Sequence, residues 1–234
     1  MTFDDDKDKG IFQALSSLVF PKICIYCQNE FASLCLNCQQ LWLASIQRRY
    51  VKGLAVNSTL AYNVASSRVV IQAKENRNRI AQYWMASALS AALEKFESDN
   101  PALSISRSLL VPIPSSKSAI RRRGESFLHP ILDKLVELQM NKNGVRWRWK
   151  ELLIHHKMVR DQSELSYTAR QSNMAGAFRL RSDDLVMERP ILLIDDVLTT
   201  GATLYSAFWA LRERNLTVLG AATVCASAHR LLIR

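Results

Sequence analysis

The chain has 234 residues and a mass of 26.6 kDa; 48% of its residues are hydrophobic and 22% are charged. This composition excludes a wholly disordered chain, and the length suits one full domain with a small additional module. Lysine and arginine number 31 against 21 acidic residues, and the net charge of +10 favours polyanionic partners or phosphorylated ligands.

The first twenty residues are predicted to form a tail and a short helix. Residues 1–9 are mostly aspartate and lysine, which is typical of a frayed terminus. Hydrophobic residues in 11–20 follow the spacing of a helix, and Pro21 ends that pattern.

Four of the five cysteines lie close together in two pairs, Cys24 with Cys27 and Cys35 with Cys38. Each pair is separated by two residues, so a tight turn can point both thiolates at one ion. Two such turns complete a tetrahedral shell of four sulfurs, which favours a structural zinc ion. Four thiolates leave no open coordination position, so we do not expect catalysis at this metal.

Three other interpretations of the cysteine pairs stay open. Two disulfides would need an oxidising compartment, a redox CxxC motif usually occurs singly after a strand, and an iron–sulfur cluster often has different spacing. The sequence shows no basic leader, and no apolar run approaches the roughly 18 residues that a membrane span needs. We therefore expect a cytoplasmic protein with reduced thiols, in which the remaining Cys225 is buried.

The rest of the chain is predicted to be of the α/β class, a parallel sheet flanked by helices. A helix is expected over 41–50, a strand over 51–62 and a long helix over 80–96. Strands are then expected at 108–113, 152–154, 190–194 and 216–226, with helices at 125–140 and 203–214. Strands that alternate with helices indicate a parallel sheet covered on both faces. The predicted domains are residues 1–50, a helix and zinc knuckle, and residues 51–234.

The most informative segment follows the buried strand over 190–194. Two acids, Asp195 and Asp196, come directly after its hydrophobic residues. A short loop then opens into a helix, and its residues are Thr199, Thr200, Gly201, Ala202 and Thr203. Backbone N–H groups at a helix N-terminus attract phosphate, threonine hydroxyls add donors, and glycine permits close approach.

The two acids would repel a phosphate and therefore need another partner. Carboxylates accept hydrogen bonds from the vicinal hydroxyls of a ribose, and they ligate hard cations such as Mg²⁺. Phosphate and diol recognition side by side describes a ribose 5-phosphate. The simpler alternative is that Asp195 and Asp196 only cap the following helix.

This segment resembles the signature of type I phosphoribosyltransferases, which bind 5-phosphoribosyl 1-pyrophosphate. Together with the four cysteines upstream, the chain is similar to the competence protein F family, the ComF/GntX-like group linked to DNA uptake and use. The resemblance extends from about residue 20 onward. It implies a type I phosphoribosyltransferase-like fold, a requirement for Mg²⁺, and Asp195 and Asp196 as catalytic residues.

Further segments carry the same resemblance. Val-Pro-Ile-Pro at 111–114, followed by Arg-Arg-Arg-Gly at 121–124, is similar to the family's VPVP and RxRG stretch. The resemblance implies that this loop embraces the pyrophosphate, and its cations would neutralise the leaving group: Lys117, Arg121, Arg122 and Arg123. A solvated basic turn is the alternative.

The segment 162–178 is similar to the family's QxxL, RxxN and GxF motifs. It implies a mobile loop that closes over the substrate and contributes Arg170 to binding. Lys74 resembles a family lysine ahead of the long helix, although a surface lysine would look the same. His155 and Val159 depart from the family pattern, which tends to have arginine and threonine there.

Two classes of function follow. As an enzyme, the protein would displace pyrophosphate from C1 of the ribose with an acceptor that the sequence does not identify. As a binding module, it would sense 5-phosphoribosyl 1-pyrophosphate or bind single-stranded DNA, with an ATPase or helicase of the uptake machinery as a further partner. The stretch 145–150 alternates arginine and tryptophan, which suits stacking on bases, but a strand with one apolar and one basic face is favoured.

Overall fold

The computed structural model describes residues 23–29, 34–43, 46–101, 103–155, 177–181 and 189–227. Its centre is a five-stranded sheet with strand order β1-β2-β7-β6-β3. The strands are β1 (Gln47–Val51), β2 (Leu54–Tyr62), β3 (Leu109–Pro112), β6 (Ile191–Leu198) and β7 (Val218–Ser227). All neighbouring pairs are parallel except β1 with β2. The predicted α/β class with a largely parallel sheet is confirmed.

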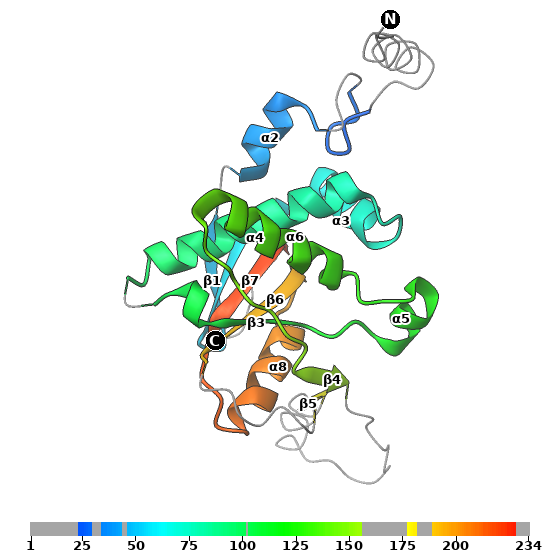
Figure 1. The fold of residues 1–234 in the computed structure, drawn as a ribbon. Helices are drawn as coiled ribbons and strands as arrows, with labels where there is room; N and C mark the ends of the chain where they lie inside the picture. The colour runs from blue at the N-terminus through cyan, green and yellow to red at the C-terminus, as the bar shows by residue number, and fades with distance from the viewer. Residues whose placement is uncertain are drawn as a thin grey trace, which may run out of the picture.

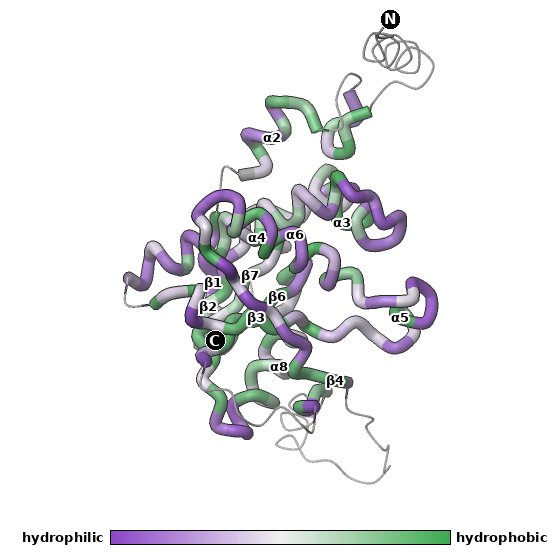
Figure 2. The backbone as a smooth tube through the Cα atoms, viewed as in Figure 1, coloured by the Kyte–Doolittle hydropathy of each residue, from purple (hydrophilic) through white to green (hydrophobic). Residues whose placement is uncertain are grey.

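Helices cover both faces of this sheet (Figure 1). One face carries α3 (Val64–Lys74), α4 (Arg79–Ser98) and α6 (Leu128–Asn143), and the other carries α8 (Ala202–Arg212). The shorter elements are α2 (Leu36–Leu43), the 3-10 helix Ile105–Arg107, α5 (Lys117–Arg123), and the two-stranded sheet of β4 (Leu153–His155) and β5 (Phe178–Leu180). Figure 2 shows that α5, which projects beside the sheet, is largely hydrophilic.

The central strand β6 has hydrophobic side chains on both faces of the sheet, so both faces are covered by helices. Leu192 and Ile194 pack into the cluster beneath α3, α4 and α6, whereas Ile191 and Leu193 pack against α8. A strand buried on both faces has a continuous hydrophobic run rather than an alternating one, which is the pattern that the sequence shows. Cys225 of β7 is fully buried in the first cluster.

The prediction of a helix over 41–50 is wrong in its second half. Helix α2 ends at Leu43, and Gln47–Val51 forms the edge strand β1, which crosses the predicted domain boundary at residue 50. A tight turn at Lys52 and Gly53, with φ angles of 46° and 87°, reverses the chain. The hairpin satisfies the backbone of β1 along β2 and buries Val51, and these tertiary contacts outweigh local helix propensity.

Three further elements differ from the prediction. Helix α3 was not expected, although Asn63 and Ser66 form a capping box at its start. Strand β6 continues to Leu198, so both acids lie within the strand rather than after it. The basic segment after β3 is a short helix, α5, whose N-cap is Ser116.

The contact between β7 and α4 supplies a stability test. A Cβ atom at Gly220 would lie 2.5 Å from the ring atoms Cε2 and Cζ of Phe96 and 2.8 Å from the carbonyl oxygen of Ala55. We expect Gly220→Ala to lower the free energy of unfolding by about 1–3 kcal/mol, because the core must be overpacked. Urea denaturation measures this change.

Gly53→Asn is the matched control, because no atom lies within 4 Å of its Cβ position and asparagine tolerates a positive φ. An equal loss of stability in both variants would contradict the packing argument.

Candidate functional site

A cavity lined by several of the sequence-predicted residues lies at the carboxyl ends of the parallel strands. It has a volume of about 540 Å³ and is lined by the ends of β2, β3 and β6, together with residues of α3 and α5. The carboxyl ends of parallel strands meet at one edge of a sheet, which is where ligands bind in α/β folds. The volume falls within the usual range of small-ligand sites.

Both predicted acids line this cavity. The backbone N–H of Asp196 donates to Oδ1 of Asp195 at 2.9 Å, and that of Val197 donates to Oδ1 of Asp196 at 2.9 Å. Each carboxylate is therefore held by the next residue of its own strand. The second oxygen of Asp196 accepts a hydrogen bond from Nζ of Lys74 at 2.9 Å, in a pair whose side chains are 13% and 33% exposed.

The environment of Asp195 disfavours its charged form. Burial raises the pKa of Asp195 well above its ordinary value, and the adjacent Asp196 carboxylate raises it further. Lys74 opposes this shift only in part. The two neighbours thus differ: Asp195 tends to keep its proton, whereas Asp196 is paired with a cation.

The loop after β6 turns at Gly201, which has φ 76° and caps α8 without a side-chain hydrogen bond. A Cβ at this position would lie 2.6 Å from both Cγ atoms of Val51, so conformation and space both require glycine. The Oγ1 of Thr200 accepts from the N–H of Ala202 at 3.3 Å. Of the five predicted loop residues, Thr199 and Thr203 line the cavity, so the first turn of α8 begins beside it.

The basic residues after β3 divide into two groups. Arg122 and Arg123 line the cavity, whereas Lys117 and Arg121 are exposed outside its lining. The side chain of Arg123 is only 7% exposed, and its Nη1 donates to Glu75 at 3.0 Å. Its Nε is buried and has no hydrogen-bond partner among the described residues. Arg122 is 65% exposed and also bonds Glu75, at 3.2 Å.

Some lining residues carried no recognisable signal in the sequence. Phe127 packs beside two cations, with Lys74 Nζ 4.6 Å and Arg123 Cζ 5.4 Å from its ring centroid. Tyr62, Val70 and Ile71 form an apolar wall of the cavity, whereas Glu75 lies outside its lining. The sequence gives no sign that Glu75 contacts the arginines, because an acidic residue after a helix is common. Only its contacts in the structure reveal this role. Arg170 and the predicted closing loop lie outside the described residues.

His155, one of the departures from the family pattern, lies close to the loop after β3. Its Nε2 is 3.1 Å from the carbonyl oxygen of Pro114, and its ring packs on Phe178 with centroids 5.0 Å apart. His155 therefore links the small β4–β5 sheet to a segment that lines the cavity.

The stretch 145–150 has the favoured apolar and basic faces, but it is not a strand, because Trp149 forms only an isolated bridge to Leu110. Trp147 is 3% exposed within the core, while Arg146 and Arg148 are exposed. The Nε1 of Trp149 donates to Asp133 at 3.0 Å, and this segment pairs with Leu110 of β3. The buried ring of Trp147 cannot stack on a nucleic-acid base.

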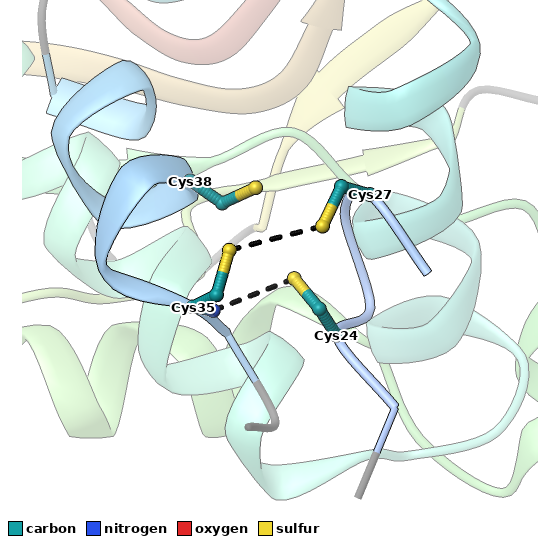
Figure 3. Close-up of side chains that lie close together, drawn as sticks. All are labelled: Cys24, Cys27, Cys35 and Cys38. Carbon is teal, nitrogen blue, oxygen red and sulfur yellow. Dashed lines mark hydrogen bonds between the residues drawn. The ribbon is translucent and has the colours of Figure 1, made fainter. Parts of the chain in front are cut away.

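The four N-terminal cysteines converge (Figure 3). Their Sγ atoms all lie within 4.8 Å of one another, and those of Cys27 and Cys35 are 3.7 Å apart. A tetrahedral zinc ion with Zn–S bonds of about 2.3 Å has sulfur–sulfur edges of about 3.8 Å. All four are free thiols, so the donor set and its spacing fit a structural zinc ion.

Local hydrogen bonds favour the thiolate form at Cys24, whereas burial and the neighbouring cysteine sulfurs raise the pKa of Cys38. Burial acts to raise the pKa of Cys24, but backbone N–H groups of Cys27, Cys35 and Tyr26 outweigh it and lower that pKa to about 6. The backbone N–H of Cys35 lies 3.5 Å from the Cys24 sulfur. A thiolate held by N–H donors is the form that binds zinc.

The cluster is attached to the helical layer over the sheet. Trp42 Nε1 donates to the carbonyl oxygen of Trp84 in α4 at 2.7 Å, and Arg68 Nη1 of α3 donates to that of Tyr26 at 3.2 Å. Tyr26 and Trp42 meet edge to face at 5.8 Å. The cysteine module therefore packs on α4 and on α3, and α3 also lines the cavity.

In the part of the chain that the structure describes, we find no helix with the length and apolarity to cross a membrane.

The cysteine geometry predicts one bound zinc per chain. Elemental analysis of the purified protein should find it, and Cys35→Ser should lower both the zinc content and the melting temperature, because four sulfurs complete the shell. Cys225→Ser, at a cysteine outside the cluster, should keep its zinc. Iron, or no metal at all, would contradict the assignment.

The raised pKa of Asp195 predicts a stability effect. The folded protein holds more protons than the unfolded chain between the ordinary carboxyl pKa and the raised one, so stability falls as pH rises through that window. Asp195→Asn removes this cost, and its Oδ1 can still accept the N–H of Asp196. We expect a melting temperature higher by roughly a few degrees at about pH 7, and little difference near pH 3. A variant less stable than wild type at neutral pH would contradict this.

Comparisons with known proteins give similarities of fold alone. No protein-family model matches the sequence, and no curated protein matches it. Among solved structures, the chain is similar to an adenine phosphoribosyltransferase at 13% identity and a TM-score of 0.41, covering 82% of this chain and 90% of that one. It is also similar to the adenine phosphoribosyltransferase of Saccharomyces cerevisiae in complex with D-2,5-dideoxy-2,5-imino-altritol 1,6-bisphosphate and adenine. The values there are 14% identity, a TM-score of 0.38, and coverage of 80% and 86%.

Proposed function

We propose that the cavity binds 5-phosphoribosyl 1-pyrophosphate with Mg²⁺, and that the protein acts as a phosphoribosyltransferase. The observation that carries this proposal is the meeting of three kinds of group around one cavity: a loop that opens a helix, two adjacent carboxylates and two arginines. Each kind matches a different part of one ligand.

The phosphate ends of the ligand match the two sides of the cavity. The loop with Thr199 and Thr203 suits the 5-phosphate, because helix N-terminal N–H groups and hydroxyls are anion donors. Arg122 and Arg123 suit the pyrophosphate, because guanidinium groups bind phosphate oxygens through paired hydrogen bonds. The carboxylates lie at the end of the strand that leads into the loop, where a ribose would join the two phosphate sites.

Asp195 and Asp196 also fit a magnesium ion in chemistry. They offer hard oxygen donors at a cavity that opens to solvent, and Mg²⁺ in proteins is commonly held by one or two carboxylates together with substrate phosphates. When bound, the ion would neutralise charge on the departing pyrophosphate. The resemblance supplies the expectation of magnesium, and the donor set is compatible with it.

In the proposed reaction, the bond between C1 of the ribose and the pyrophosphate oxygen breaks, and pyrophosphate leaves with the bonding electrons. An acceptor forms the new bond to C1 and gives up a proton. Arg122 and Arg123 stabilise the departing charge, and the hydroxyl contacts of Asp195 and Asp196 orient the ribose. The apolar wall of α3 and Tyr62 has no role toward this donor, so we place the acceptor there.

The resemblance alone supports the wider biological role. We propose that the protein serves in DNA uptake or the use of external DNA in the cytoplasm, in company with an uptake ATPase or helicase. Sensing of 5-phosphoribosyl 1-pyrophosphate without catalysis is the alternative within the same site. The proposal that two indole rings bind single-stranded DNA is weakened, because one of them, Trp147, is buried in the core and cannot stack on a base.

Calorimetry with 5-phosphoribosyl 1-pyrophosphate, with and without Mg²⁺, tests the site. We expect Mg²⁺ to tighten binding to wild type, and Asp196→Asn to weaken binding at saturating Mg²⁺ by roughly tenfold or more, because a charged ligand contact is lost. Asp133→Asn is the control, because this exposed acid on α6 lies outside the cavity lining. Equal binding by wild type and Asp196→Asn would overturn the site assignment.

Release of pyrophosphate separates the two alternatives. An enzyme should release it from the bound ligand only when Mg²⁺ and an acceptor are present, whereas a sensor should bind the ligand and leave it intact.

A further inference from the structure

Two adjacent residues of opposite charge, at the end of α3, form ion pairs with residues that line the cavity. Lys74 pairs with Asp196 at 2.9 Å. Glu75, the next residue, bonds Arg122 at 3.2 Å and Arg123 at 3.0 Å. Three of the charged groups that we assign to the donor ligand and its cation, on Asp196, Arg122 and Arg123, are thus already paired within the chain.

The backbone fixes these two residues in place. The N–H of Glu75 donates to the carbonyl oxygen of Ile71 at 2.8 Å and ends α3. Asn78 begins α4 three residues later, where its Oδ1 accepts the N–H groups of Ile80 and Ala81 at 3.0 Å. Hydrogen bonds that end α3 and begin α4 fix the backbone on both sides of Lys74 and Glu75. The positions of these two residues relative to the cavity are therefore set by the backbone.

The contacts of Glu75 have the chemistry of the pyrophosphate that we propose as ligand. Its two carboxylate oxygens bridge two guanidinium groups, as two phosphate oxygens would. The ammonium group of Lys74 meets the carboxylate that we assign to the ribose diol or to Mg²⁺. Glu75 therefore places a negative charge where the pyrophosphate would lie, and Lys74 places a positive charge where Mg²⁺ would lie.

We propose that Lys74-Glu75 is an internal counter-ion pair that occupies the charged groups of the cavity in the free protein. Binding would then proceed by exchange: Arg122 and Arg123 would exchange Glu75 for pyrophosphate oxygens, and Asp196 would exchange the ammonium group of Lys74 for Mg²⁺. Glu75 accordingly lowers the affinity for the donor and sets the ligand concentration at which the site fills. This inference rests on the proposed function, because it concerns the same ligand.

Burial and hydrogen bonding favour exchange over a permanent contact. The side chains of Glu75 and Arg122 are 38% and 65% exposed, and ion pairs open to solvent contribute little stability. The Nε of Arg123 is buried without a partner, so the contact with Glu75 leaves its guanidinium incompletely bonded.

Glu75→Gln is the decisive variant, with binding of 5-phosphoribosyl 1-pyrophosphate and Mg²⁺, and of inorganic pyrophosphate, measured by calorimetry. The cap of α3 uses the backbone of Glu75, so the variant should fold, and its melting temperature checks this. We expect its dissociation constants to be roughly threefold to tenfold lower than those of wild type, because a competing charge has gone.

Glu151→Gln is the matched control. Glu151 also pairs with an arginine, Arg181 at 3.3 Å, and it is 27% exposed, but Arg181, unlike Arg122 and Arg123, lies outside the cavity lining. Its replacement should leave both dissociation constants unchanged. In an Arg122→Gln background, the gain from Glu75→Gln should shrink, because one of the two released guanidinium groups is missing.

The sign of the change decides the outcome. Weaker or unchanged binding by Glu75→Gln would overturn the inference, and weaker binding would show instead that Glu75 positions the arginines. In both cases wild type still binds the donor, so the proposed function stands. If neither wild type nor Glu75→Gln binds the donor or pyrophosphate, the inference and the proposed function both fall.

Discussion

Two carboxylates side by side at the end of a buried strand repel each other, and the surroundings of β6 are arranged to tolerate them. The backbone N–H groups of Asp196 and Val197 each donate to the preceding carboxylate, and Lys74 crosses from α3 to pair with Asp196. Asp195 meets the remaining cost by holding its proton more firmly, with a pKa raised by burial and by its neighbour. Strongly shifted pKa values of this kind are concentrated at functional sites of proteins.

The helix that supplies this lysine also connects the cavity to the cysteine module. Near its middle, Arg68 holds the carbonyl oxygen of Tyr26, within the first cysteine turn, and at its end Lys74 and Glu75 reach the cavity. Trp42 anchors α2 on α4 beside it. A metal ion held by the four cysteines would therefore act on the cavity only through packing, by helping to hold α3 in place.

The sequence revealed the parts of the fold that depend on local pattern. The hydrophobic run of β6, the long helix α4 and the paired cysteines all have signals within one short window. The edge strand β1 was missed because its pairing with β2, not its own residues, makes it a strand. Motif spacing located the acids and the loop, but only three-dimensional contacts separate Arg122 and Arg123 from Lys117 and Arg121, or bring Glu75 to the arginines.

The contact of Gly201 with Val51 bears on the order in which the protein matures. The methyl groups of Val51 occupy the space where any side chain on the loop would stand, and Val51 is delivered there by the hairpin of β1 and β2. These two residues are 150 positions apart in the sequence (201 − 51), and contacts between distant segments form late because closing a long loop costs entropy. The loop is thus expected to acquire its final shape only after the N-terminal hairpin has docked.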